Sequence, residues 1–452
     1  MNDPRRALPS VAALLALDEV RAASVSEPHG RLVAAARAAV AEVRDGHAFA
    51  PPDLAAWGAR VTSALTRRDP HMLRRVVNAT GVVLHTNLGR APLAPEAVAA
   101  IAQRAAEYCN LELDLESGLR GGRQDECVDA LCAITGAEDA LVVNNGAAAV
   151  SLAVHALANG GPVAISRGEL VEIGGSFRVP EVMRVAGVTL LEVGTTNRTH
   201  LADYVAALDA GARAVVKVHR SNFRIVGFTA EVADSELARL CRERGVPLIH
   251  DFGSGLLVSL ERFGLTGEPT AAEVVRGGAS VVAMSGDKLL GGPQSGILLG
   301  TTSVIETLRR HPFARAVRVD KLVLAALGAT LALYSDVETA TRRVPALRLI
   351  TTPVAELEER AAALVDRLRD AHIGASVVAS EGAVGAGAFP TVALPSAGIA
   401  IAGDPATNTL ALRAQHVPVI GRIRDGVTLL DLRSVPERDD DLLGDMTVAA
   451  LA

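Results

Sequence analysis

The sequence contains very little lysine. Of its 45 basic residues only three are lysines, Lys217, Lys288 and Lys321. Arginine can replace lysine as a positive charge, but it cannot form a Schiff base because its guanidinium group stays protonated. A lysine retained in such an arginine-biased chain is therefore a candidate for covalent chemistry.

Cysteine is also scarce, and its pattern excludes two kinds of structural site. The four cysteines form no CxxC pair, and no histidines cluster around them at the spacing of metal ligands. We therefore expect free thiols in a reducing compartment, no disulfide framework and no metal site.

Long apolar runs are missing, and no stretch approaches the roughly 20 apolar residues that cross a membrane as a helix. We expect a cytoplasmic protein without membrane contact. No GxGxxG motif follows the first expected strand, which disfavours a nicotinamide-dependent dehydrogenase. The net charge of -6 argues against a surface that binds nucleic acid throughout, but it leaves room for a basic patch on one domain.

The residues that are present indicate three domains. A chain of 452 residues exceeds the roughly 100–200 residues of a single domain. Residues 1–75 show apolar residues at helical spacing in three stretches and a modest excess of arginine over acidic residues. Residues 76–335 alternate short apolar strands with amphipathic helices. Residues 336–452 begin with a long helix, continue with short strands and glycine-rich turns, and form a small α+β domain.

The alternation of strands and helices in the middle of the chain predicts a mainly parallel sheet with helices on both faces. Ligands bind such sheets at the carboxyl ends of the strands. The polar residues expected at those ends are Asn145, Ser221, Asn222, Asp251 and Lys288.

The turn after the strand near residue 140 is suited to a phosphate group. Asn145, Gly146 and Ala147 lead from this strand into a helix. Free backbone amides and the helix dipole converge at a helix N-terminus, and small side chains let a phosphate approach them. Many strand–helix turns of this kind hold no ligand, so the turn alone does not establish a site.

Lys288 follows a short apolar strand and belongs to the segment VVAMSGDKLLGGPQSG, residues 281–296. The strand, the Ser285-x-x-Lys288 spacing and the glycine-rich turn are typical of the lysine that links to the cofactor in fold-type-I pyridoxal phosphate enzymes. A surface lysine after a strand is the alternative. Asp251 lies where an acid pairs with the pyridinium nitrogen of that cofactor, although it could also cap the turn that follows it.

Three arginines are candidates for an anion site. Arg90 follows Gly89, and Arg315 and Arg318 would share a face if residues 302–325 are helical. Each could equally be a solvated surface residue.

Several of these motifs together resemble the bacterial selenocysteine synthase family, the L-seryl-tRNA(Sec) selenium transferases. The resemblance covers nearly the whole chain. It rests on RALPSVAALL near the start, NATGVVLHTNLGRAPL at 78–93, NNGAAAV at 144–150, RSNF at 220–223, HDFGSG at 250–255, SGDKLLGGPQSG at 285–296, and PVIGRIRDG with LLDLR near the end.

This resemblance implies a fold-type-I pyridoxal phosphate transferase with an N-terminal helical domain that binds tRNA. Lys288 would hold the cofactor and Asp251 would pair with its nitrogen. The remaining cofactor contacts would be Asn145, Gly146, Ala147, Asn222 and Ser285. The arginines Arg90, Arg315 and Arg318 would bind the phosphate of the selenium donor.

The reaction implied is the conversion of seryl-tRNA(Sec) to selenocysteinyl-tRNA(Sec) with selenophosphate as the donor. Water is eliminated from the seryl group and selenium is added at its β-carbon. The family also implies a homo-oligomer, a decamer built from dimers. Some of the N-terminal arginines, Arg67 and Arg68 among them, would contact the tRNA.

Two other functions stay open from the sequence. One is a pyridoxal phosphate lyase that acts on a small amino acid or amino sugar acid, and the N-terminal helical module disfavours it. The other is a non-catalytic tRNA-binding protein, which the presence of both Lys288 and Asp251 disfavours.

Overall fold

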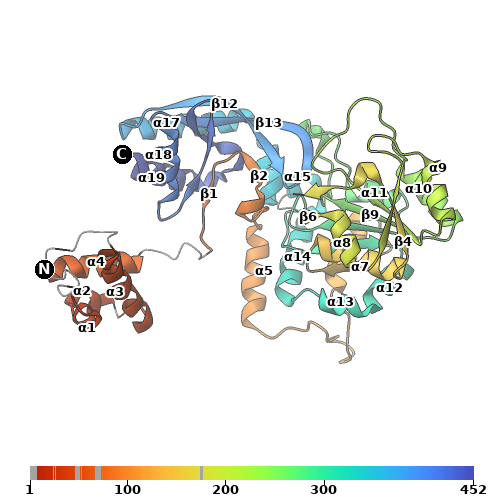
Figure 1. Ribbon diagram of the computed structural model, residues 1–452, viewed down its shortest axis with the longest axis horizontal. Coiled ribbons are helices and arrows are strands. Elements are labelled where there is room, and N and C mark those ends of the chain that lie inside the picture. The colour runs from red at the N-terminus through yellow and green to blue at the C-terminus, as the bar shows by residue number, and fades with distance from the viewer. Residues whose placement is uncertain are drawn as a thin grey trace. The chain divides into compact units, whose positions relative to one another are not determined.

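The computed structural model describes residues 8–23, 25, 27–45, 51, 53–66, 73–173 and 177–452. The chain divides into two compact units, Met1–Arg75 and Val76–Ala452. Both are drawn in Figure 1. No helix in the described part of the chain is long and apolar enough to span a membrane.

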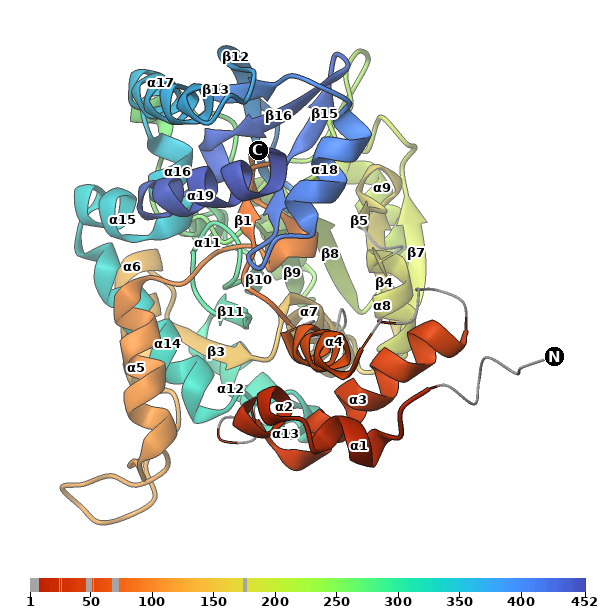
Figure 2. The ribbon, with the colours of Figure 1, turned by 90° about the vertical axis from the view of Figure 1, so that its left-hand side faces the viewer.

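The first unit consists of short helices around a small apolar core (Figure 2). The first stretch predicted as one helix is two helices in the structure. Ser10 caps the first by accepting the amide of Ala13, and Asp18 and Glu19 open the second, where acidic side chains favour a helix N-terminus. The helices are α1 (Val11–Leu15), α2 (Asp18–Ala23), α3 (His29–Arg44) and α4 (Leu54–Thr66). The predicted tRNA contacts Arg67 and Arg68 lie outside the described residues.

The second unit is built on a seven-stranded sheet whose strand order is β3-β11-β10-β9-β8-β4-β7. Six strands run in one direction and β11 runs against them. The strands are β3 (Asp139–Val143), β4 (Pro162–Ser166), β7 (Thr189–Val193), β8 (Ala214–Val218), β9 (Leu248–Gly253), β10 (Val281–Ser285) and β11 (Gly296–Gly300). The prediction of a mainly parallel sheet is confirmed.

Helices cover both faces of this sheet (Figure 1), and the side chains of each strand alternate between the two cores. On β10, Val281 and Ala283 point into the core with α7 and α12, whereas Val282 and Met284 point into the core with α6 and α14. This is the period of two expected of a strand buried on both faces.

The helices of this region are α5 (Pro95–Ala106), α6 (Asp125–Thr135), α7 (Gly146–Ala158), α8 (Val179–Val185), α9 (Leu201–Asp209), α10 (Asp234–Glu243), α11 (Ala271–Arg276), α12 (Thr302–Arg310), α13 (Pro312–Ala316), α14 (Lys321–Leu331), α15 (Val337–Arg343) and α16 (Pro345–Thr351).

A second, five-stranded sheet has the order β15-β16-β13-β12-β2. Its last strand, β2, comes from residues 82–84 and pairs in parallel with β12, although the sequence placed those residues in the large domain. Near the C-terminus, β15 and β16 pair as an antiparallel hairpin. The remaining elements are β1 (Val77–Asn78), β2 (Val82–Leu84), β5 (Glu172–Ile173), β6 (Phe177–Arg178), β12 (Ala375–Gly385), β13 (Ala388–Ile401), β14 (Val419–Ile420), β15 (Arg422–Arg424), β16 (Val427–Asp431), α17 (Val354–Asp370), α18 (Pro405–Arg413) and α19 (Asp440–Leu451).

Asp431, at the end of β16, is a fully buried carboxylate that ties this second sheet together. It accepts hydrogen bonds from the hydroxyls of Ser380 and Ser396, at 2.8 and 2.6 Å. It also accepts one from the Arg422 guanidinium at 2.8 Å. A Cβ on Gly81 would lie 2.6 Å from its Oδ2, so only glycine lets the chain before β2 pass here.

We expect Asp431→Asn to lower the free energy of unfolding by about 3 kcal/mol, because hydrogen bonds to a charged acceptor are lost inside the protein. Urea denaturation monitored by circular dichroism measures the change. Asp425→Asn is the matched control, since the Asp425 side chain is exposed, and it should change the free energy by less than about 0.5 kcal/mol. Equal effects of the two substitutions would contradict a structural role for the buried carboxylate.

Candidate active site

A cavity of about 320 Å³ opens at the carboxyl ends of the parallel strands. Most of the predicted site residues line this cavity. They are Arg90, Asn145, Gly146, Ala147, Asp251, Ser285 and Lys288. The volume lies near the lower end of the range for small-molecule sites, which suits a compact cofactor.

The N-terminus of α7 forms one wall of the cavity. Asn145 caps this helix by accepting the amide of Ala148 at 2.9 Å, and the first amides of any helix have no partner within it. A Cβ on Gly146 would lie 2.6 Å from the hydroxyl oxygen of Ser285, so glycine keeps the wall open. Backbone amides and a hydroxyl thus meet where a phosphate group would bind.

Lys288 lies in the turn after β10 and is only 6% exposed. The turn is closed by backbone hydrogen bonds from Gly292 to Gly286 and from Gly286 to Ser295. Burial lowers the pKa of Lys288, and the nearby Arg90 charge lowers it further, while Asp251, Asp287 and Glu268 act in the opposite direction. A lysine whose pKa is lowered holds more neutral amine near neutral pH and is therefore more nucleophilic.

Asp251 lies in β9, paired in register with Ala283 of β10. Burial raises the pKa of Asp251 to about 6, and the charges of Lys288 and His219 oppose this shift. A cationic ring nitrogen placed against this carboxylate would favour its charged form in the same way. The carboxylate, the lysine and the α7 amides therefore fit the three ends of pyridoxal phosphate.

Arg90 reaches the cavity from the loop after β2. Its backbone is left-handed, with φ of 61°, and its guanidinium pairs with Asp287 at 2.7 Å. Asp287 was not predicted, although it directly precedes Lys288. The ion pair fixes the arginine beside the lysine turn, where its charge acts on Lys288.

Asn222 does not line the cavity, contrary to the sequence prediction. Its amide donates to the carbonyl of Glu172 at 2.7 Å, and the preceding residue, Ser221, faces the cavity instead. The loop turns directly after β8, so residue 221 rather than 222 points inward.

Arg315 and Arg318 lie in a different pocket, of about 820 Å³. The predicted continuous helix is interrupted, because α13 ends at Ala316 and Arg318 follows it. Arg318 instead pairs with Glu112 at 3.2 Å. Within one chain, Arg90 alone of the three predicted arginines lines the Lys288 cavity.

Other residues of the cavity had weaker signals in the sequence or none. His219 directly follows β8, at the carboxyl end of the strand, and lines the cavity. Ala386 lines it from the tip of the β12–β13 hairpin, more than 90 residues after Lys288 in the chain. Nothing in the local sequence pattern indicates that this hairpin reaches the site. Thr86 and Gln294 also face the cavity.

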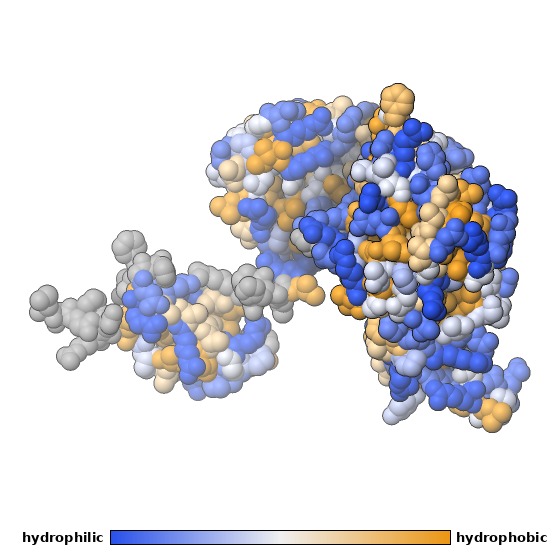
Figure 3. All heavy atoms as spheres, turned by 45° about the vertical axis from the view of Figure 1, so that its right-hand side comes forward, coloured by the Kyte–Doolittle hydropathy of each residue, from blue (hydrophilic) through white to orange (hydrophobic). Residues whose placement is uncertain are grey.

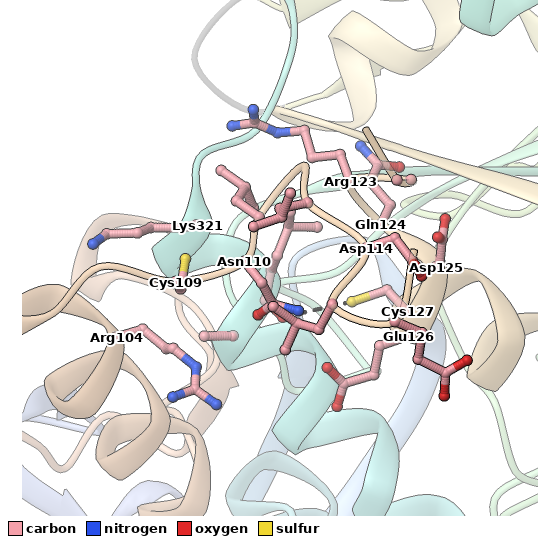
Figure 4. Close-up of a pocket in the computed structure, with 18 residues that line it drawn as sticks. Arg104, Cys109, Asn110, Asp114, Arg123, Gln124, Asp125, Glu126, Cys127 and Lys321 are labelled. Atoms are coloured by element: carbon pink, nitrogen blue, oxygen red, sulfur yellow. Dashed lines mark hydrogen bonds between the residues drawn. The ribbon is translucent and has the colours of Figure 1, made fainter. Parts of the chain in front are cut away.

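A third pocket, of about 420 Å³, lies between α5, α6 and α14 and lacks this combination of groups (Figure 4). Arg104 and Lys321 are on one side and Asp125 and Glu126 on the other. Lys321 donates to the carbonyl of Glu107 at 2.7 Å, and burial raises the pKa of Cys127 to about 12. The thiol of Cys127 therefore stays protonated and the amine of Lys321 is bound to a carbonyl, so this pocket is less suited to covalent chemistry than the Lys288 cavity.

We expect Asp251→Asn to move the reaction of Lys288 with pyridoxal phosphate to lower pH. The Asp251 carboxylate stabilises the ammonium form of Lys288, so its loss lowers the pKa of Lys288 further. The rate of absorbance change after mixing cofactor-free protein with pyridoxal phosphate, followed across pH, measures this midpoint. Asp129→Asn, at an exposed position on α6, should leave it in place. A midpoint that stays or rises in Asp251→Asn would disprove the coupling.

The chain is similar to a family of known enzymes over most of its length. The family described as L-seryl-tRNA selenium transferase matches residues 76–436. A relative in Geobacter sulfurreducens, named L-seryl-tRNA(Sec) selenium transferase, is 49% identical, with 96% of each chain covered. One of the same name in Methylocella silvestris is 47% identical and covers 96% of this chain and 94% of its own.

Among solved structures, D-glucosaminate-6-phosphate ammonia-lyase is similar, with a TM-score of 0.60 and 20% identity. The match covers 84% of this chain and 96% of that one, and it shows a shared fold. The predicted fold-type-I architecture is confirmed, and the cofactor of this fold and family is pyridoxal phosphate. On the evidence of the family match and of relatives similar over nearly its full length, the chain belongs to the L-seryl-tRNA selenium transferases.

Proposed function

We propose that this enzyme converts seryl-tRNA(Sec) to selenocysteinyl-tRNA(Sec), with selenophosphate as the selenium donor and pyridoxal phosphate as the cofactor. The observation that carries the proposal is the convergence of Lys288, Asp251 and the α7 N-terminus on one cavity. The three groups meet the three chemical requirements of the cofactor: an amine for its aldehyde, an acid for its ring nitrogen and amides for its phosphate.

Bound pyridoxal phosphate supplies an aldehyde that links to amines and a ring that accepts the electron pair of the α-carbon. Asn145, Gly146, Ala147 and Ser285 hold its phosphate at the start of α7. Asp251 keeps a proton on its ring nitrogen, which requires the carboxylate to stay charged. Burial raises the pKa of Asp251 to about 6, so the carboxylate is mostly charged at neutral pH, and a cationic ring nitrogen beside it would favour this form further.

Lys288 has two roles in the reaction. Its amine would hold the cofactor through the aldehyde. When it is free of the cofactor, Nζ would take the proton from the α-carbon of the seryl group, for which its lowered pKa suits it. The β-hydroxyl would leave with a proton as water. The selenium of the donor would then bond to the β-carbon, and water would cleave the P–Se bond, which releases phosphate and gives selenocysteinyl-tRNA.

Arg90 binds the phosphate of the selenium donor from within the cavity. Arg315 and Arg318 are proposed for the same role because the resemblance to the family implies it. The positive charge of the pocket that they line supports anion binding there. Arg120, Arg123 and Arg318 all pair with the single carboxylate of Glu112, so positive charge is in excess. Bidentate arginine is suited to a phosphate.

The helical unit at the N-terminus binds the tRNA in this proposal, the region from 76 to 335 holds the cofactor, and residues 336–452 form the small domain. The modest excess of arginine over acidic residues in the first unit is compatible with tRNA binding, because recognition of RNA by shape needs few charges. A reaction on an aminoacylated tRNA fits a cytoplasmic protein.

A homo-oligomer, a decamer built from dimers, is part of the proposal. The segment between α5 and α6 projects from the second unit in Figure 1, and Figure 3 shows apolar side chains at the surface of this unit. In that segment Tyr108, Leu115 and Leu119 are at least 70% exposed. Several exposed apolar side chains in one loop are typical of a surface that another chain covers.

The test of the cofactor role is an absorbance spectrum of the purified enzyme before and after borohydride. We expect a band of the lysine-linked cofactor that reduction removes and that Lys288→Ala lacks. Lys321→Ala is the matched control, because this lysine lies in the α5–α14 pocket, and it should keep the band. A wild-type protein that shows no band after addition of pyridoxal phosphate would refute the proposed function.

For the donor site we expect Arg315→Ala to keep the cofactor band and to lose at least about tenfold in the rate of selenium transfer, because a charged contact to the donor phosphate is removed. Formation of selenocysteinyl-tRNA at limiting selenophosphate measures the rate. Arg244→Ala, which breaks an exposed ion pair with Asp209, should keep the rate. Normal use of selenophosphate by Arg315→Ala would remove Arg315 from the donor site.

A further inference from the structure

Behind the cavity wall, His219 and Glu268 form a pair that the reaction described above does not use. His219 Nε2 lies 3.1 Å from Glu268 Oε1, and the Glu268 side chain is only 1% exposed. Neither atom has a hydrogen-bond partner in the described part of the chain, so the contact between them is one of charge and proximity. Burying a carboxylate is costly unless a partner compensates it, and the imidazole is the titratable side chain that faces this oxygen.

His219 stands next to the acid that serves the cofactor ring. Its backbone amide donates to the carbonyl of Asp251 at 2.8 Å, and the residue lines the cavity. The carboxylate oxygen 3.1 Å from Nε2 favours the ring orientation that turns this nitrogen toward it.

Glu268 also contacts the second sheet. Its other oxygen, Oε2, accepts the backbone amide of Phe389 at 3.2 Å. Phe389 follows the tip of the β12–β13 hairpin, and its backbone is left-handed, with φ of 48°. At the same tip Ala386 lines the cavity, and a Cβ on Gly387 would lie 2.8 Å from the hydroxyl of Ser221. One carboxylate therefore joins the hairpin tip to the histidine of the cavity.

The charges of the pair reach the cofactor groups. The Glu268 carboxylate raises the pKa of Lys288, and the His219 imidazole lowers the pKa of Asp251. The other charged or titratable groups that line the pocket beside His219 and Glu268 are Glu169, Lys217, Arg220, Arg224, Glu231, Asp234 and His250. Lys217 lies 3.2 Å and His250 3.4 Å from Asp234, and Arg220 pairs with Glu231.

We propose that Glu268 is a positioning residue of selenium transfer, which fixes the orientation of His219 beside Asp251 and makes that orientation depend on the seated tip of the β12–β13 hairpin. The inference rests on the proposed function for the identity of the reaction. The contact between Glu268 and His219 itself is independent of the tRNA substrate.

Glu268→Gln tests the proposal because it keeps the shape of the side chain and removes its charge. We expect this variant to bind pyridoxal phosphate and to move the pH midpoint of the lysine-linked absorbance band down by about half a unit or more, since an anion that raises the pKa of Lys288 is lost. The rate of selenocysteinyl-tRNA formation should fall at least about tenfold, as for displaced orienting groups elsewhere. Glu268→Asp should recover part of the midpoint shift, and the exposed Glu261→Gln should match the wild type in both measurements.

The variant His219→Asn tests the other residue of the pair, and it keeps the proposal testable if Glu268→Gln does not fold. It should show the rate loss of Glu268→Gln, and the double variant should be no slower than the slower single variant, because the two residues act as one unit. A Glu268→Gln midpoint and rate equal to those of the wild type would overturn the proposal. So would losses that multiply in the double variant, or a His219→Asn enzyme of normal rate. A wild-type enzyme that binds the cofactor but makes no selenocysteinyl-tRNA would refute the proposed function instead, and the midpoint shift would still decide the role of Glu268.

Discussion

The site depends on the burial of one ammonium group opposite one carboxylate. Asp251 lies in β9 and Lys288 lies in the turn after the neighbouring strand β10, where Lys288 is buried and Asp251 is half-buried. Burial disfavours the charged form of both, so the pKa of the lysine falls while that of the acid rises. Burial thus makes the amine of Lys288 more reactive, but it also favours the neutral form of Asp251. A cationic cofactor ring beside Asp251 would restore the charged carboxylate and would leave the amine neutral. The two residues are therefore suited to binding that cofactor between them.

Much of this site could be predicted from the sequence because its parts are local. A strand followed by small residues and a helix indicates an anion site through backbone geometry alone, and the turn of Asn145, Gly146 and Ala147 is built in this way. Lys288 and Asp251 were found because polar residues after apolar strands converge at one sheet edge. The helical pattern of the N-terminal region was likewise sufficient for its class, although a break between α1 and α2 was missed.

What the sequence could not show depends on contacts between distant segments. Asn222 and Ser221 are adjacent, and only the bond from Asn222 to Glu172 decides which of them faces the cavity. The partner of Arg90 is Asp287, nearly 200 residues away. The hairpin tip at Ala386 belongs to another sheet. No periodicity or spacing within one segment carries such information, because it is set by how the sheets pack.

The pairing of β2 with β12 has a consequence for how the protein is made. The two strands are separated by about 300 residues of chain, and contacts between such distant segments form late because a long loop must close first. A ribosome releases residues 82–84 long before residues 383–385 exist. The loop after β2, which carries Arg90, therefore has no paired strand beside it to fix its position until synthesis is nearly complete. Completion of the reaction centre is thus one of the last events of folding, so a chain that stops short of this strand is left without a finished site.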